Sequence, residues 1–89
     1  MRIVWTDYLR YRAALRGFDL ADVEHIVRYS SERYRDHVTG SHIAVGPQGK
    51  IQMMVAYEVT EEVLTPITAH ATTRVQINAR LKSGRFTHE

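Results

Sequence analysis

The sequence contains no cysteine and no apolar run longer than about five residues in its 89 positions. The missing cysteine excludes disulfides, thiolate metal sites and cysteine nucleophiles. The apolar runs are far shorter than the roughly 20 residues that a membrane-spanning helix needs. The first residues also lack the apolar stretch of a signal peptide, so we expect a cytoplasmic protein with no membrane contact.

A chain of this length has room for one domain, and we expect residues 1–89 to form it. Such a domain buries only about 60–65% of the surface that its unfolded chain exposes. The hydrophobic fraction of 44% and the charged fraction of 25% are those of a folded globular protein. There is no space for a separate cofactor domain, and no cofactor is expected.

The net charge of +2 is too small to indicate nucleic-acid binding, but the charge is unevenly distributed. Residues 1–16 sum to +3 and residues 72–88 to +4, whereas residues 17–34 and 50–71 each sum to −2. Both ends of the chain are therefore basic and its middle is mildly acidic. The sequence does not indicate where Arg12 and Arg16 lie.

The first thirty residues predict two short helices. Thr6 and Asp7 are typical of a helix start and Gly17 of a helix end. The apolar residues recur at spacings of three and four, which predicts a buried stripe of Tyr8, Tyr11, Leu15 and Phe18. A second helix is expected from its cap at Asp19 to about Tyr29. Its expected inner face contains Leu20, Val23, Ile26, Val27 and Ser30.

After residue 32 the pattern alternates, which predicts an antiparallel meander of four strands. The strands are expected at 33–36, 42–45, 51–57 and 63–70, with turns at 39–40, 46–49 and 60–62. Pro66 lacks an N–H group, so its strand lies at an edge or contains a bulge.

Residues 72–85 fit either a strand or a helix. We favour a helix, because Thr72 or Thr73 can cap it and Gly84 can end it. The predicted fold class is α+β.

The alternation also predicts which side chains share a face of the sheet. The face covered by helices is expected to contain Ile43, Val45, Ile51, Met53, Val55, Tyr57, Val63 and Ile67. That choice pairs Val45 with Ile51, Tyr57 with Val63, and Met53 with Ile67. The opposite, open face would then contain Arg33, Arg35, His37, His42, Gln52, Glu58, Thr68 and His70. Such a face is a candidate platform for phosphate and base contacts.

His70 is the main candidate for chemistry, because it ends a strand four residues before Arg74 at the next helix start. A histidine can move a proton during RNA cleavage, and an arginine can clamp the phosphate. The alternative is that His70 faces solvent and Arg74 pairs with a surface acid.

Arg33 and Arg35 either contact phosphates, beside Gln52, or protect a sheet edge. The cations Arg80, Lys82 and Arg85 either follow a polynucleotide, meet an acidic partner or form a solvated helix face. His37 and His42 are a weak metal signal, and no metal is expected.

Two stretches resemble a known family: Leu15-Arg16-Gly17-Phe18, and the segment Pro66–Arg74 that leads from the last strand into the helix. With the order of elements, they are similar to the RelE-like toxins of bacterial toxin–antitoxin systems, particularly the BrnT family. BrnT-like chains similarly end a strand with a basic motif of small residues before a charged helix.

The resemblance implies a metal-independent endoribonuclease that cleaves mRNA, free or ribosome-bound, and is neutralised by a cognate antitoxin. It implies that His70, Arg74, Arg33 and Arg35 form the site. The lysine-rich platform of ribosome-dependent members is missing, because only Lys50 and Lys82 occur. The alternative is a non-catalytic interaction domain of the same fold that binds an acidic protein or nucleic acid.

Overall fold

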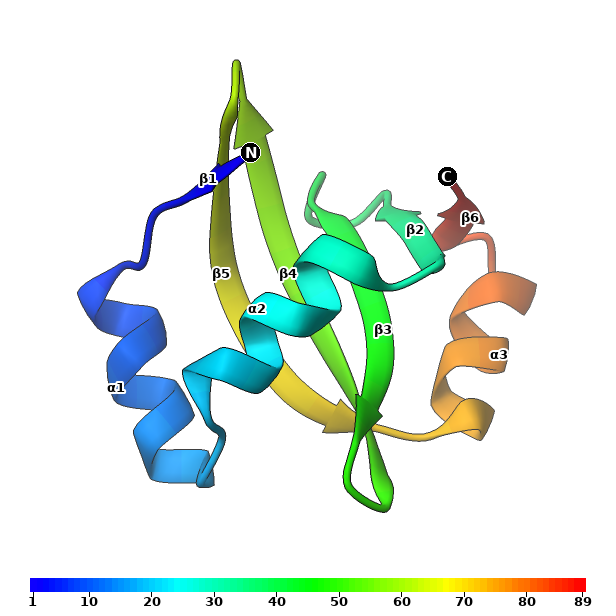
Figure 1. Ribbon diagram of the computed structural model, residues 1–89. Helices are drawn as coiled ribbons and strands as arrows, with labels where there is room; N and C mark the ends of the chain where they lie inside the picture. The colour runs from blue at the N-terminus through cyan, green and yellow to red at the C-terminus, as the bar shows by residue number, and fades with distance from the viewer.

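The computed structural model describes residues 1–89 and has a six-stranded mixed sheet with three helices (Figure 1). The elements in chain order are β1 (Arg2–Ile3), α1 (Asp7–Arg16), α2 (Leu20–Tyr29), β2 (Glu32–Asp36), β3 (His42–Gln48), β4 (Ile51–Thr60), β5 (Val63–Thr72), α3 (Arg74–Lys82) and β6 (Phe86–His88). The strand order in the sheet is β1-β5-β4-β3-β2-β6. The α+β class is as expected.

The sheet has six strands rather than the four expected. Strands β2 to β5 are consecutive and antiparallel, β1 pairs parallel to β5, and β6 pairs antiparallel to β2. The two added strands are only two and three residues long. Their partners are distant in sequence, and no local pattern marks so short a strand. None of the three helices has both the length and the apolar character needed to cross a membrane.

The helix starts follow the predicted capping signals. The Thr6 side chain accepts a hydrogen bond from the backbone N–H of Leu9, and the Asp19 side chain accepts one from Ala21. Gly17 ends α1 at a φ of 72°, a conformation that costs glycine little. In α2 the expected residues Val23, Ile26 and Val27 are buried.

The expected buried stripe of α1 is wrong. Tyr8, Tyr11 and Leu15 are exposed, and the buried residues are Leu9 and Ala13. The cause is the position of α1, which lies at one margin of the molecule and packs on β5 (Figure 1). A helix at a margin buries only a narrow stripe, so large apolar side chains remain in solvent.

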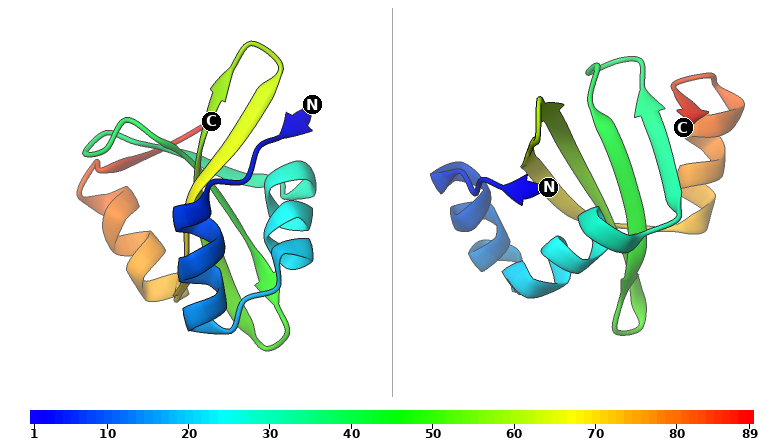
Figure 2. Two further views of the ribbon diagram at one scale, coloured as in Figure 1. Left: turned by 90° about the vertical axis from the view of Figure 1, so that its left-hand side faces the viewer. Right: turned by 45° about the horizontal axis from the view of Figure 1, so that its top comes forward.

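Residues 74–82 form the expected helix, α3, and Thr73 and Gln76 make a reciprocal capping box at its start. Helices α1 and α2 pack on one face of the sheet and α3 on the other (Figure 2). Ile77 of α3 is fully buried against Tyr34, Ile43, Val45, Met54 and Phe86. The second face is therefore partly covered rather than open.

The predicted strand register is wrong. Val45 pairs with Met54, Tyr57 with Pro66, and Met53 with Ala71. The turn expected at residues 46–49 lies further along the chain. Strand β3 continues to Gln48, and the hairpin loop contains only Gly49 and Lys50. Gly46 lies in β3 beneath α2, where an added Cβ would stand 2.9 Å from Cγ1 of Ile26. This glycine thus allows the close approach of a helix instead of forming a turn.

The corrected register moves several side chains to other faces. Met53, Val55 and Tyr57 do face α1 and α2, but Ile43 and Val45 face α3. The β4–β5 ladder shifts between Ala56 and Tyr57. There Thr68 pairs with Ala56 and Pro66 with Tyr57, which leaves Ile67 as an extra residue. The alternative of a bulge at Pro66 is the one that the structure adopts.

Candidate functional site

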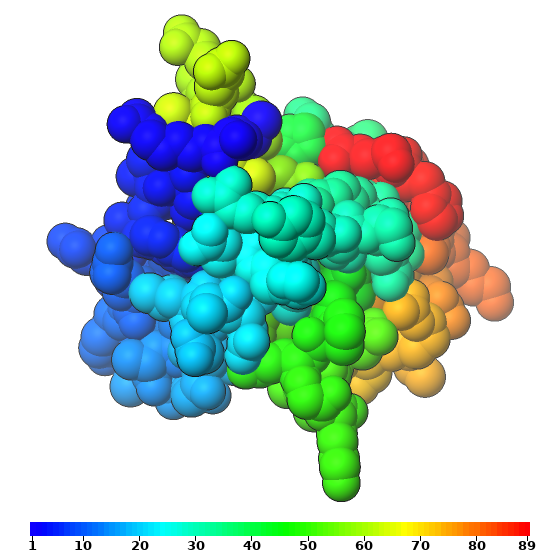
Figure 3. All heavy atoms as spheres, viewed as in Figure 1, coloured from blue at the N-terminus to red at the C-terminus, as the bar shows by residue number.

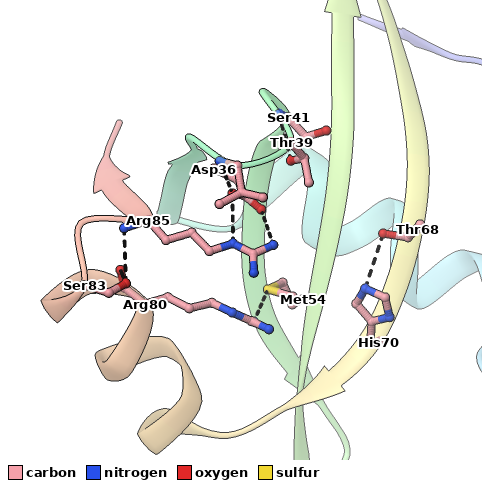
Figure 4. Close-up of polar contacts among 10 residues, drawn as sticks. Asp36, Thr39, Ser41, Met54, Thr68, His70, Arg80, Ser83 and Arg85 are labelled. Carbon is pink, nitrogen blue, oxygen red and sulfur yellow. Dashed lines mark hydrogen bonds and ion pairs between the residues drawn. The ribbon is translucent and has the colours of Figure 1, made fainter.

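A hollow of about 210 Å³ lies between the sheet and the α3 end of the chain. The residues that line it come from β2, the β2–β3 connection, β3, β4, β5, α3 and the segment before β6 (Figure 4). Those with polar or charged side chains are Asp36, Thr39, Ser41, Thr68, His70, Arg80 and Arg85. Three of the residues singled out in the sequence, His70, Arg80 and Arg85, are thus brought together.

The ladder and α3 position these groups. His70 pairs with Met54, whose side chain belongs to the cluster under α3, so His70 faces the same side. Arg80 follows the buried Ile77 by about one helical turn and therefore also points toward the sheet. A guanidinium nitrogen of Arg80 lies 3.6 Å from the sulfur of Met54, and its Cζ lies 5.5 Å from the centroid of the Phe86 ring. No carboxylate is within ion-pair distance of Arg80.

Arg85 also lines the hollow, but a carboxylate neutralises its charge. Its Nε and one terminal nitrogen each donate to Asp36 at 3.0 Å, and Asp36 is only 3% exposed. Burial alone would raise the pKa of Asp36. The hydrogen bonds from Arg85 and from the backbone N–H groups of Val38 and Thr39 outweigh it, so the pKa is lowered. This pair fixes the segment before β6 against the β2–β3 connection.

His70 has no acidic partner. Its half-buried position lowers its pKa, and the positive charges of Arg16, Arg80 and Arg12 lower it further. Its only polar side-chain contact is with the hydroxyl oxygen of Thr68, 3.4 Å from Nε2. The lowered pKa favours the neutral imidazole, which can accept a proton.

Arg12 and Arg16, whose positions the sequence did not predict, lie on α1, and their positive charges lower the pKa of His70. Arg16 donates to the carbonyl oxygen of Ala69 at 2.9 Å, on the outer edge of β5. That carbonyl is free because β1 pairs only with Val63 and Leu64. Nε of Arg12 is buried and has no hydrogen-bond partner. No local signal in the sequence links α1 to His70, because the contact depends on how α1 packs on β5.

Arg33 and Arg35 do not share a face with His70, contrary to the prediction. Arg33 pairs with Ala44, Ala44 with Val55, and Val55 with Ala69, so they share the face of Ala69 instead. The Arg33 side chain donates to the carbonyls of Ser30 and Val27 at 2.9 and 2.8 Å, and to the Tyr57 hydroxyl at 2.9 Å. Arg33 therefore holds the end of α2 onto the sheet. Arg35 is exposed on that same face.

Arg74 is also separate from His70. It donates to both carboxylate oxygens of Glu32, at 2.5 and 2.9 Å, and to the side-chain oxygen of Gln52 at 2.9 Å. The hydrogen bond from Arg74 lowers the pKa of Glu32. Glu32 and Gln52 line a different hollow of about 340 Å³, beside α2. The alternative noted for Arg74, pairing with an acid, is the one observed.

The predicted site is therefore divided. His70 and Arg80 remain together, with Arg85 paired beside them, whereas Arg33, Arg35, Gln52 and Arg74 lie elsewhere. Lys82 is exposed in the last turn of α3 and makes no ion pair.

An imidazole that lies beside an unpaired guanidinium group, as His70 lies in one hollow with Arg80, can take a proton from a hydroxyl group, and the guanidinium group can stabilise a developing phosphorane charge. Comparisons with protein-family models, with curated proteins and with solved structures find no match to this chain.

Proposed function

We propose that the protein is a metal-independent endoribonuclease of the toxin type, which acts on mRNA in the cytoplasm and is neutralised by a cognate antitoxin. The observation that carries the proposal is that His70 and Arg80 line one hollow and that neither of them is paired with a carboxylate. The one acid of that hollow, Asp36, is paired with Arg85. Two helices, four consecutive antiparallel strands and a further helix also support a RelE-like arrangement, to which β1 and β6 are additions.

In this mechanism His70 acts as the general base. It accepts the proton of a ribose 2′-hydroxyl, and the 2′ oxygen attacks the adjacent phosphorus. The bond from phosphorus to the 5′ oxygen breaks, and that oxygen takes a proton from solvent. The products are a 2′,3′-cyclic phosphate and a 5′-hydroxyl. The guanidinium group of Arg80 stabilises the additional negative charge of the phosphorane.

The test is cleavage of end-labelled RNA by the purified protein in EDTA, with and without ribosomes. We expect His70→Gln to lose about 100-fold or more in rate. Lys82→Gln, an exposed cation outside the hollow, is the matched control and should cleave at the unmodified rate. The proposal is refuted if the unmodified chain neither cleaves RNA, with or without ribosomes, nor arrests growth on expression. Full cleavage activity of His70→Gln would also refute it.

The antitoxin part of the proposal has its own test. A small acidic or DNA-binding protein encoded beside this chain is expected to copurify with it and to abolish cleavage in a stoichiometric mixture. Cleavage that persists in the presence of such a bound protein contradicts neutralisation, although it leaves the nuclease activity standing.

A further inference from the structure

Helix α1 carries two large aromatic side chains that are mostly exposed to solvent. Tyr8 is 57% exposed and Tyr11 is 62% exposed, whereas Leu9 and Ala13 on the opposite side of the helix are buried. Figure 3 shows α1 along one margin of the molecule, where its outer face is open to solvent. Aromatic rings in such a position are available for stacking.

The exposed tyrosines adjoin arginines of the same helix. Cζ of Arg12 lies 5.9 Å from the centroid of the Tyr8 ring, within cation–π distance. At 100° per residue, Arg12 and Arg16 lie on α1 between the tyrosine side and the side that faces β5. The aromatic rings and the guanidinium groups lie on the α1 side of β5, whereas His70 lies on the opposite face of the same strand, so a ligand that reaches both must pass over the edge of β5. We define Tyr8, Tyr11, Arg12 and Arg16 as the α1 strip.

The charge of the α1 strip favours an anionic occupant. Arg10, Arg12 and Arg16 make no ion pair, and the helix contains only one acid, Asp7. Nε of Arg12 is buried without a hydrogen-bond partner, so a phosphate oxygen beside the guanidinium would meet an unneutralised charge. Aromatic groups that lie beside cationic groups match the bases and the phosphates of an unpaired strand. The faces of bases inside a duplex are already occupied.

We infer that the α1 strip binds single-stranded RNA, with bases stacked on Tyr8 and Tyr11 and phosphates held by Arg12 and Arg16. The strand then continues over the outer edge of β5 to His70. This inference rests on the proposed function for the direction of the strand and the identity of the ligand. It assigns the substrate class as unpaired RNA and gives α1 the role of a binding platform.

Fluorescence anisotropy with a labelled RNA of about 12 nucleotides tests the inference, in a His70→Gln background that prevents cleavage. We expect Tyr8→Ser and Tyr11→Ser each to weaken binding about tenfold. Tyr8→Phe and Tyr11→Phe should bind like the parent, because the ring is kept. Tyr29→Ser is the matched control, since Tyr29 is 71% exposed on α2 and lies outside the strip. The same RNA annealed to its complement should bind at least about tenfold more weakly.

The α1 strip is refuted if the serine variants bind RNA like the parent, or if the duplex binds as tightly as the single strand. It is also refuted if the serine variants lose binding to a protein partner but keep RNA binding, which would make the strip a protein interface. These outcomes are distinct from failure of the proposed function. Cleavage that depends on His70 but not on the tyrosines refutes only the strip. Tyrosine-dependent RNA binding by a chain that never cleaves refutes only the nuclease.

Discussion

The arginines beside β2 and those beside β5 differ in the partners that their guanidinium groups have within the protein. At β2, Arg33 donates to two carbonyls and a phenol, Arg74 pairs with Glu32, and Arg85 pairs with Asp36. At β5, Arg16 donates a hydrogen bond only to a backbone carbonyl, Arg80 contacts a thioether sulfur and the Phe86 ring, and Nε of Arg12 has no hydrogen-bond partner. The first group stabilises the fold, and the second group is free to bind an anion.

This difference separates arginines that stabilise the fold from arginines that are available to a ligand, although both kinds contribute equally to the net charge. Arginines whose donors are satisfied inside the protein contribute to stability through hydrogen bonds and buried ion pairs. Arginines without such partners contribute little to stability and retain their charge for a ligand. Substitutions in the two groups should therefore affect different measurements.

The largest effect on stability is expected at Arg85. Arg85→Met leaves the carboxylate of Asp36 buried without its ion pair, so we expect the free energy of unfolding to fall by about 3 kcal/mol in urea titrations. Adding Asp36→Asn should restore part of the loss, because the buried charge is removed. If Arg85→Met unfolds at the same urea concentration as Lys82→Met, Arg85 does not stabilise the fold and belongs with the arginines beside β5.

Arg80→Gln is expected to reduce the rate of RNA cleavage but to change the free energy of unfolding only slightly. It removes a guanidinium beside His70, so the rate of RNA cleavage should fall by about 50-fold. Its free energy of unfolding should change by less than about 1 kcal/mol, the worth of one cation–π contact. A variant that is as active as the parent but strongly destabilised would reverse the assignment.

A smaller loss of stability is expected at Arg33. Arg33→Met removes the hydrogen bonds to Val27, Ser30 and Tyr57, and should cost about 2 kcal/mol in thermal or urea unfolding. Arg35→Met, two residues along the same strand but exposed, is the matched control. RNA binding by Arg33→Met should equal that of the parent. Weakened RNA binding in a folded Arg33→Met protein would show that the α2 face also contacts the ligand.

The smallest expected effect is a pH dependence from His70. Its pKa in the folded chain lies below the ordinary value of 6.5, so the unfolded chain binds more protons between the two values. The free energy of unfolding should therefore decrease as the pH falls from above 6.5 through the folded pKa. His70→Gln should remove this part of the slope. An NMR titration should show the pKa of His70 rising toward 6.5 in Arg80→Gln, and an unchanged pKa would contradict the role of that charge.

The parts of the fold that local chemistry determines were predictable. Thr6, Asp19 and Thr73 cap helices where their side chains can accept backbone N–H groups, and Val23, Ile26 and Val27 form the buried face of α2. The position of His70 near the end of a strand that precedes a helix was also predicted. These features depend on neighbours within a few residues.

The parts that depend on distant segments were not predictable. Gly46 and Pro47 have the composition of a turn, and only the approach of Ile26 explains why Gly46 lies inside a strand. That single misassignment changed the register and placed Arg33 on the wrong face. The effect of Arg12 and Arg16 on the pKa of His70 depends on the packing of α1 on β5, which the sequence pattern of α1 does not encode.

The contact between Arg16 and the Ala69 carbonyl also bears on self-association. An unpaired strand edge is a template for a strand of another molecule, and β1 covers only Val63 and Leu64 of the long strand β5. A guanidinium that occupies a carbonyl further along this edge prevents a neighbouring polypeptide from pairing there. The same margin of the molecule that is open to a flexible anionic strand is thereby closed to the growth of an intermolecular sheet.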